Sequence, residues 1–160
     1  MQRSNESKRI LLVVLILFVA IQFACSTRYG RGNDMNSVRV RYMINELDPA
    51  VEFYTKYLGF QIKQQNKPYF AMLSRGQLEL ILSANSGPGG AAKPMSNGQK
   101  AEPGGWDRII LNVDDLQGEV SRLKSAGVHF RNDISTGPGG SEILLDDPSG
   151  NPVELFQPAG

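Results

Sequence analysis

The stretch VRVRYMI at Val38–Ile44 decides the fold, because a second stretch, RIILNV at Arg108–Val113, repeats its character and its surroundings. Each is a β-rich run followed by a helix pattern, which Gly59 ends in the first case and Gly127 in the second. An alignment without gaps pairs Arg39 with Arg108, Ile44 with Val113, Leu47 with Leu116, Val51 with Val120 and Tyr54 with Leu123. The chain therefore contains an internal repeat.

Three further strands are expected after each helix, so that each half has the order βαβββ. The first helix is expected to begin with Asp48 as its N-cap and Pro49 at its first helical position. The predicted strands are Phe60–Lys63, Tyr69–Ser74 and Leu78–Ser83 in the first half, and Val128–Arg131, Glu142–Asp146 and Val153–Gln157 in the second. Composition predicts tight turns at Asp147–Asn151 and at Gly137–Gly140.

Two phrases are more specific than the repeat: AVEFYTKYLGF at Ala50–Phe60 and DDPSGNPVELF at Asp146–Phe156. Together with the paired modules they resemble the vicinal-oxygen-chelate superfamily of glyoxalases, bleomycin-resistance proteins and dioxygenases, over Val38–Pro158. The resemblance implies an α+β fold in which paired βαβββ modules form an open, cup-shaped mixed sheet with helices outside. It also implies that the ligand binds in the concavity.

The chain divides into a leader, a linker and one domain. The predicted boundaries are 1–25 for a signal or lipoprotein-like leader, 26–36 for the linker and 37–158 for the domain, with repeat one at 38–83, a loop at 84–105 and repeat two at 106–157. The loop is rich in Gly and Pro and poor in apolar residues. Two readings of it are open, a flexible linker between the repeats and a lid over the ligand site.

The N-terminus combines a basic start with an apolar run from Ile10 to Ala24, which has the length of a secretory h-region. Cys25 follows directly and resembles the acylated cysteine of a bacterial lipobox, although Gln22 stands where that motif has leucine. An exported or membrane-anchored lipoprotein is therefore the first expectation. The alternatives are a cleaved soluble signal, an uncleaved anchor, and a start at Met35 that gives a cytoplasmic domain.

Charge and composition exclude several function classes. Lys and Arg number 17 and Asp and Glu 16, for a formal net charge of +1, and no long basic run outside the leader suggests a nucleic-acid partner. The single cysteine excludes an intrachain disulfide. The single histidine, His129, is expected to be an ordinary strand residue, and one histidine gives no credible Ser/His/Asp arrangement.

Strand alternation predicts which side chains face the concavity, since residues i and i+2 share a face. In the first, fourth, fifth and last strands one face is apolar and should pack under the helices. The opposite faces direct four charged side chains inward, namely Arg39, Glu79, Arg108 and Glu154. The resemblance implies that these are the family's four metal-ligand positions, which hold His or Gln, Glu or His, His, and Glu in metal-dependent members.

An arginine cannot be a metal ligand, because a guanidinium is always protonated and has no lone pair to donate. We therefore expect no divalent metal and no other cofactor here, and no metal-dependent glyoxalase I reaction. Two guanidiniums and two carboxylates at one point can instead form Arg–Glu pairs that hold the repeats together. In the alternative reading an arginine, Arg41 included, binds an anionic ligand, and Glu79 or Glu154 is a catalytic general base.

Three functions are open on this reading. The first is a metal-free protein that binds a small molecule as bleomycin-resistance proteins do, the second is a lyase, isomerase or dioxygenase-like enzyme acting on a small oxygenated substrate, and the third is a surface-tethered interaction module. The candidate ligand-binding residues are Arg39, Arg41, Met43, Phe70, Trp106, Arg108, Ile110, Asn112 and Phe156, with Trp106 covering the mouth of the cup. Because relatives pair their modules within one chain or across a dimer, a homodimer is a further alternative.

Overall fold

The computed structural model describes residues 39–160 of the chain. The leader at 1–25, the acylation of Cys25 and the linker at 26–36 lie outside the described residues and stay predictions. Within the described part, none of the helices is both long enough and apolar enough to cross a bilayer.

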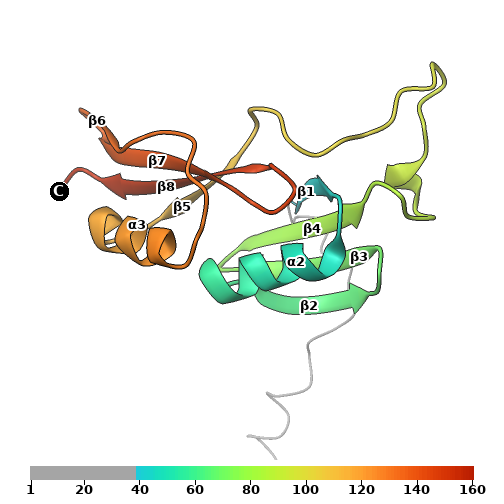
Figure 1. Cartoon of the computed structure of the whole chain (residues 1–160), viewed down its shortest axis with the longest axis horizontal. Helices are drawn as coiled ribbons and strands as arrows, with labels where there is room; N and C mark the ends of the chain where they lie inside the picture. The colour runs from blue at the N-terminus through green and yellow to red at the C-terminus, as the bar shows by residue number, and fades with distance from the viewer. Residues whose placement is uncertain (1–38) are drawn as a thin grey trace, which may run out of the picture. The chain divides into compact units, whose positions relative to one another are not determined.

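The first βαβββ module precedes the long loop (Figure 1). Its strands are β1 (Arg39–Ile44), β2 (Gln61–Asn66), β3 (Phe70–Arg75) and β4 (Leu78–Ala84), and its helix α2 (Leu47–Glu52) continues as a π-helical turn over Phe53–Tyr57. The strands form one sheet in the order β1-β4-β3-β2, in which β1 runs parallel to β4 and the other neighbours are antiparallel. A 3₁₀ turn at Gly90–Ala92 follows in the loop.

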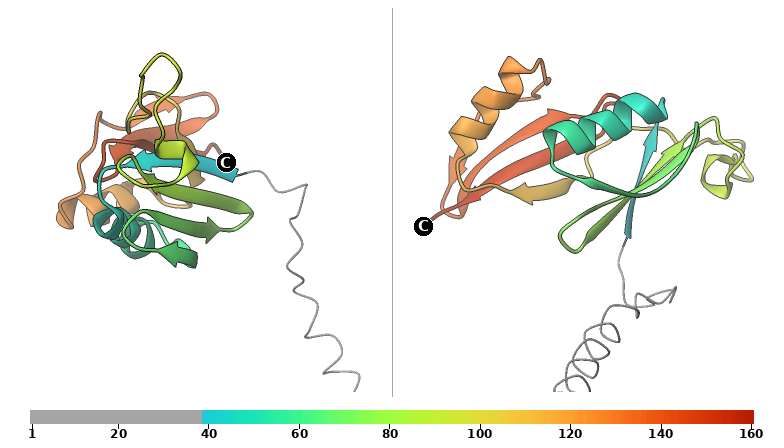
Figure 2. Two further views of the ribbon diagram at one scale, coloured as in Figure 1. Left: turned by 90° about the vertical axis from the view of Figure 1, so that its right-hand side faces the viewer. Right: turned by 90° about the horizontal axis from the view of Figure 1, so that it is seen from below.

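The second module repeats this plan. Its elements are β5 (Ile109–Asn112), α3 (Leu116–Ser125), β6 (Ser135–Gly137), β7 (Gly140–Asp146) and β8 (Pro152–Pro158). The sheet order is β5-β8-β7-β6, with β5 parallel to β8. Figure 2 shows α3 along one face of its sheet, as α2 lies along one face of the first sheet. The predicted α+β fold with paired βαβββ modules is confirmed.

The start of α2 differs from the prediction. Glu46 and not Asp48 is the N-cap, and its side chain makes no capping hydrogen bond. Asp48 and Pro49 both lie inside the first helical turn, where a proline is tolerated because the first N–H groups have no partner within the helix. The helix begins earlier because Leu47 is buried in the core, so that packing decides its first residue.

The sixth strand also lies later in the chain than predicted. Val128–Arg131 forms no strand and makes one isolated bridge, between Phe130 and Leu145, while β6 is Ser135–Gly137. His129 is therefore not a strand residue. The prediction failed because Phe130 packs against the core from an irregular segment, which gives the same apolar pattern as a short strand. The hairpin turn predicted after β6 is confirmed by the pairing of β6 with β7.

Alternation separates a buried from an open face along β5, whereas β4 and β8 carry buried residues on both faces. In β5, Ile109 and Leu111 are buried, whereas Ile110 and Asn112, which point to the opposite face, are exposed. The buried faces and the helices form the hydrophobic core. The opposite faces are left for a functional site.

A buried polar joint connects the two modules. Asp147, which is 4% exposed, accepts hydrogen bonds from the Tyr54 hydroxyl (3.0 Å), from the Asn151 side-chain amide (2.9 Å) and from two backbone N–H groups of its own turn. The Asn151 amide also donates to the carbonyl of Met43 in β1 (2.8 Å), and its Oδ1 accepts from the N–H of Gly104 (2.8 Å). The turn that composition predicts therefore fixes β1 and the end of the loop.

Tyr42 forms a second connection between the modules. Its hydroxyl donates to the carbonyl of Pro152 (2.9 Å) and accepts from the N–H of Ile109 (2.9 Å). Burial raises the pKa of this phenol to about 12, although the hydrogen bond from Ile109 acts in the opposite direction. The folded chain therefore favours the neutral form of Tyr42.

Replacing Asn151 tests the joint. We expect Asn151→Ala to lower the free energy of unfolding by about 2–3 kcal/mol, because it leaves the buried Asp147 carboxylate and the Met43 carbonyl short of donors. Urea denaturation followed by circular dichroism measures this. Asn97→Ala is the matched control, since the Asn97 side chain accepts a bond only from Gln99 in its own turn, and it should cost less than about 0.5 kcal/mol. Equal losses in the two variants would show that the joint contributes nothing special.

The raised pKa of Tyr42 predicts a loss of stability in alkali. The unfolded chain releases a phenol proton near pH 10, whereas folded Tyr42 holds it up to about pH 12. The stability that the neutral phenol supports is therefore complete below about pH 10 and falls by up to about 3 kcal/mol by about pH 12. Urea titrations across this range should show a smaller fall in Tyr42→Phe. An identical alkaline fall in the variant would contradict the assignment.

Candidate functional site

The four charged residues predicted to face inward form two pairs. Arg39 Nε donates to Glu79 Oε2 (2.5 Å), and Arg108 Nε donates to Glu154 Oε2 (2.6 Å). The first pair joins the parallel strands β1 and β4, and the second joins Arg108, the residue before β5, to β8. Every ion pair within residues 39–160 joins groups of the same module, so neither Arg–Glu pair holds the two repeats together, as one reading of the sequence predicts.

The two pairs differ in burial. The Glu79 side chain is 27% exposed, whereas that of Glu154 is 4% exposed. The hydrogen bond to Glu154 raises the pKa of Arg108 above its already high ordinary value, so this guanidinium is charged at any physiological pH. A buried carboxylate is costly without such a partner, which makes the second pair the more important for stability.

These four residues do not fit a divalent metal. Each guanidinium donates to a glutamate oxygen that a metal ion would need, and it has no lone pair of its own to offer. Across residues 39–160, no three His, Cys, Asp or Glu side chains gather in a way that could hold a metal ion. The ligand set of a metal-dependent relative is thus not present at these positions.

The difference between the pairs can be measured. We expect Arg108→Met to lower the free energy of unfolding by about 2–4 kcal/mol, because it leaves the Glu154 carboxylate buried without a cation. Arg39→Met should cost less than about 1 kcal/mol, since the Glu79 carboxylate keeps access to water. Both variants lose one charge and keep a long side chain, so each controls for the other in urea denaturation. A larger loss in Arg39→Met would reverse the assignment.

A hollow of about 490 Å³ beside the first sheet contains Arg41. Its lining residues are Arg41, Asn66, Tyr69, Phe70, Ser83, Ala84 and Gly87–Ala92. Among the described residues of this lining, Arg41 is the one basic residue and none is acidic. The Arg41 Nη1 group donates to the hydroxyl of Ser83.

Strand register brings the polar and aromatic parts of this hollow together. In the parallel pair of β1 and β4, Arg41 lies opposite Ile81 and Met43 lies opposite Ser83. In the antiparallel pair of β3 and β4, Phe70 lies opposite the same serine. Three neighbouring strands therefore supply a guanidinium, a hydroxyl and an aromatic ring to one place.

Two of the predicted ligand-binding residues, Arg41 and Phe70, line the hollow. Ser83 also lines it but was not selected as a site residue, although alternation puts it on the same face as Glu79 and could have identified it. The rim at Gly87–Ala92 belongs to the long loop, for which the sequence allows two readings, a flexible linker and a lid. No periodicity encodes the path of such a loop, so its place beside Arg41 could not be predicted.

The remaining predicted residues lie elsewhere. Ile110 and Asn112 are on the open face of β5, and Asn112 is opposite Phe156 of β8. The predicted ligand-binding residues that do not line the hollow around Arg41 are Arg39, Met43, Trp106, Arg108, Ile110, Asn112 and Phe156. The structure thus divides the predicted site between the two sheets.

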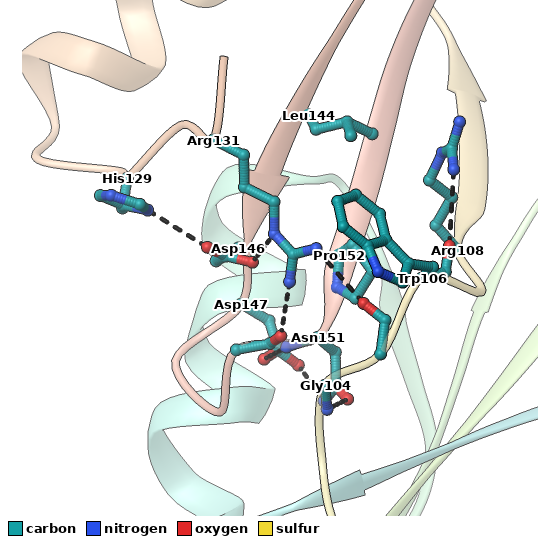
Figure 3. Close-up of polar contacts among 12 residues, drawn as sticks. Gly104, Trp106, Arg108, His129, Arg131, Leu144, Asp146, Asp147, Asn151 and Pro152 are labelled. Carbon is teal, nitrogen blue, oxygen red and sulfur yellow. Dashed lines mark hydrogen bonds and ion pairs between the residues drawn. The ribbon is translucent and has the colours of Figure 1, made fainter.

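Trp106 is largely exposed and contacts Arg131, whose guanidinium carbon lies 5.6 Å from the ring centre (Figure 3). Arg131 also donates to Asp146 Oδ1 (2.6 Å) and to the carbonyls of Gly105 (3.3 Å) and Gly150 (3.0 Å). Arg131, which was not among the predicted site residues, therefore fixes the end of the loop to the turn before β8. The sequence around Arg131 gives no indication of this role, because the hydrogen-bond partners of Arg131 lie in distant segments.

Comparison with known proteins identifies the family. The model of the Glyoxalase/Bleomycin resistance protein/Dioxygenase superfamily matches residues 37–155, and the chain belongs to this superfamily. The chain is 30% identical over 131 residues to the uncharacterized protein YurT of Bacillus subtilis (strain 168). The alignment covers 77% of this chain and 99% of that protein.

Two solved structures have a similar fold. Lactoylglutathione lyase from Agrobacterium tumefaciens aligns with a TM-score of 0.61 at 17% identity, over 79% of this chain and 96% of that one. TnmS3, an antibiotic binding protein from Streptomyces sp. CB03234, aligns with a TM-score of 0.54 at 23% identity, over 77% of this chain and 97% of that one. Identities this low show the fold alone.

Proposed function

We propose that this chain binds a small molecule with an anionic group and an apolar body in the hollow around Arg41, without a metal and without changing it chemically. The observation that carries the proposal is the exposed guanidinium of Arg41, which forms no ion pair within residues 39–160. Arg39 and Arg108 each pair with a glutamate, whereas Arg41 faces a hollow whose lining has no carboxylate.

A guanidinium in this setting favours an anionic partner. The contact of Arg41 with Ser83 is to a neutral hydroxyl and uses one of its two terminal nitrogens. The planar guanidinium has five N–H donors, and two of them can bind both oxygens of a carboxylate or phosphate at once. Strands β1 and β4 hold both residues, so the anion site requires little rearrangement.

The rest of the hollow suits an apolar body. Phe70, Tyr69, Ala84 and the alanines of the 3₁₀ turn contribute apolar surface to the lining. Its volume of about 490 Å³ lies within the roughly 300–1,000 Å³ range of small-molecule sites. TnmS3, an antibiotic binding protein with this fold, supports binding as a use of the scaffold.

An enzymatic role has less support. The lyase from Agrobacterium shares the fold, but the candidate bases of this chain, Glu79 and Glu154, each accept a hydrogen bond from an arginine. Neither glutamate lines the hollow around Arg41. A group that is to accept a proton from a substrate must lie within hydrogen-bond reach of it.

Octanoate, a small anion with an apolar tail, is a suitable probe. We expect Arg41→Met to weaken octanoate binding by about 2 kcal/mol, roughly thirtyfold, because it removes a charge-assisted contact. Isothermal titration calorimetry measures the change. Arg75→Met is the matched control, since Arg75 lines a different hollow and its loss changes the net charge equally. Equal affinity in wild type and Arg41→Met, or chemical turnover of the bound probe, would refute the proposal.

A further inference from the structure

A second hollow, of about 240 Å³, adjoins the first. Its lining residues are Asn45, Glu46, Leu47, Asp48, Pro49, Pro68, Tyr69, Ala84 and Ser86. Tyr69 and Ala84 are the two residues that line both hollows as the structure describes them. Ala84 is 4% exposed and offers only a methyl group, whereas Tyr69 is 41% exposed, so the tyrosine is the large side chain at the boundary.

Backbone and loop contacts fix Tyr69 at this boundary. Its N–H donates to the carbonyl of Asn66 (3.1 Å), and its carbonyl accepts from the N–H of Ala84 (2.9 Å). The segment after β4 packs on its side chain, since a Cβ at Gly87 would lie 3.0 Å from the Cβ of Tyr69 and 3.3 Å from its Cδ1. Glycine at this position allows the loop to approach the tyrosine closely, which restricts the movement of the ring.

We infer that Tyr69 sets the length of ligand that the hollow around Arg41 accepts, and that it is a specificity-determining residue. The inference rests on the function proposed above. A ligand whose anionic group is bound at Arg41 extends its apolar tail through the first hollow until the tail meets the tyrosine ring. The ligands that fit are therefore monoanions, such as carboxylates, with an uncharged apolar tail of limited length.

The chemistry of the second hollow supports such a limit. Its lining includes the carboxylates of Glu46 and Asp48, and Lys67 Nζ lies 2.7 Å from Asp48 Oδ1. The first hollow has a cation and apolar surface, whereas the second has exposed acidic groups at its rim. The ring of Tyr69 separates these two environments.

Calorimetry on the full chain with a series of straight-chain carboxylates tests the inference. The series is hexanoate, octanoate, decanoate and dodecanoate. In wild type the affinity should rise roughly fourfold with each buried methylene, and stop rising where the tail meets the ring. In Tyr69→Ala the two hollows become continuous. The rise should then continue for at least two more methylenes, a gain of roughly fifteenfold for the longest probe.

Two further variants are matched controls. Tyr69→Phe keeps the ring and should keep the wild-type length limit. Tyr69→Leu keeps an apolar side chain of smaller size and should move the limit by a smaller amount, which gives a second test if Tyr69→Ala does not fold. Circular dichroism shows which variants are folded.

The outcomes separate this inference from the proposed function. If wild type binds none of the four carboxylates, or binds them as Arg41→Met does, the proposed function fails and the inference fails with it. If binding depends on Arg41 but the length limit is the same in wild type, Tyr69→Leu and Tyr69→Ala, the inference alone fails. Affinity that rises through the whole series in wild type would also overturn it.

Discussion

The carboxyl group of Asp147 is buried and accepts hydrogen bonds from a phenol, a side-chain amide and two backbone N–H groups. Since an unsatisfied buried carboxylate is very unfavourable, these donors must all be in place at once. Tyr54 comes from one module and Asn151 from the other, so their hydrogen bonds to Asp147 hold the two modules together. Asn151 also binds the carbonyl of Met43 in β1, the strand that holds Arg41. The candidate site thus depends on a turn that lies outside it.

Much of the fold could be predicted because it is encoded locally. The apolar periods and the closing glycines at Gly59 and Gly127 gave two βαβββ modules, and both glycines have the positive φ that such positions need. The two errors in the predicted fold, the start of α2 and the position of the sixth strand, have one cause. The start of α2 is decided by the burial of Leu47, and the segment around Phe130 packs on the core while it pairs with β7 only through an isolated bridge to Leu145. In both places tertiary packing outweighed local signals.

Less of the site could be predicted, because it depends on partners distant in the sequence. Alternation along the first strand separates Arg41 from the apolar face that packs in the core. It could not show that Arg39 and Arg108 each pair within their own sheet, since that depends on which strands become neighbours. Nor could it show that the chain at Gly87 packs against Tyr69, because a loop rich in glycine has no period to interpret. Composition gave the turn at Asp147, but not its role in joining the modules.

Each arginine–glutamate pair lies within one module, and this affects which substitutions the chain can tolerate. Groups that share no partner contribute to stability almost independently, so a substitution in one pair need not be matched by a substitution in the other. A substitution in one module therefore leaves the pair in the other module intact. Because Glu154 is more buried than Glu79, the second module should tolerate fewer substitutions at its pair than the first.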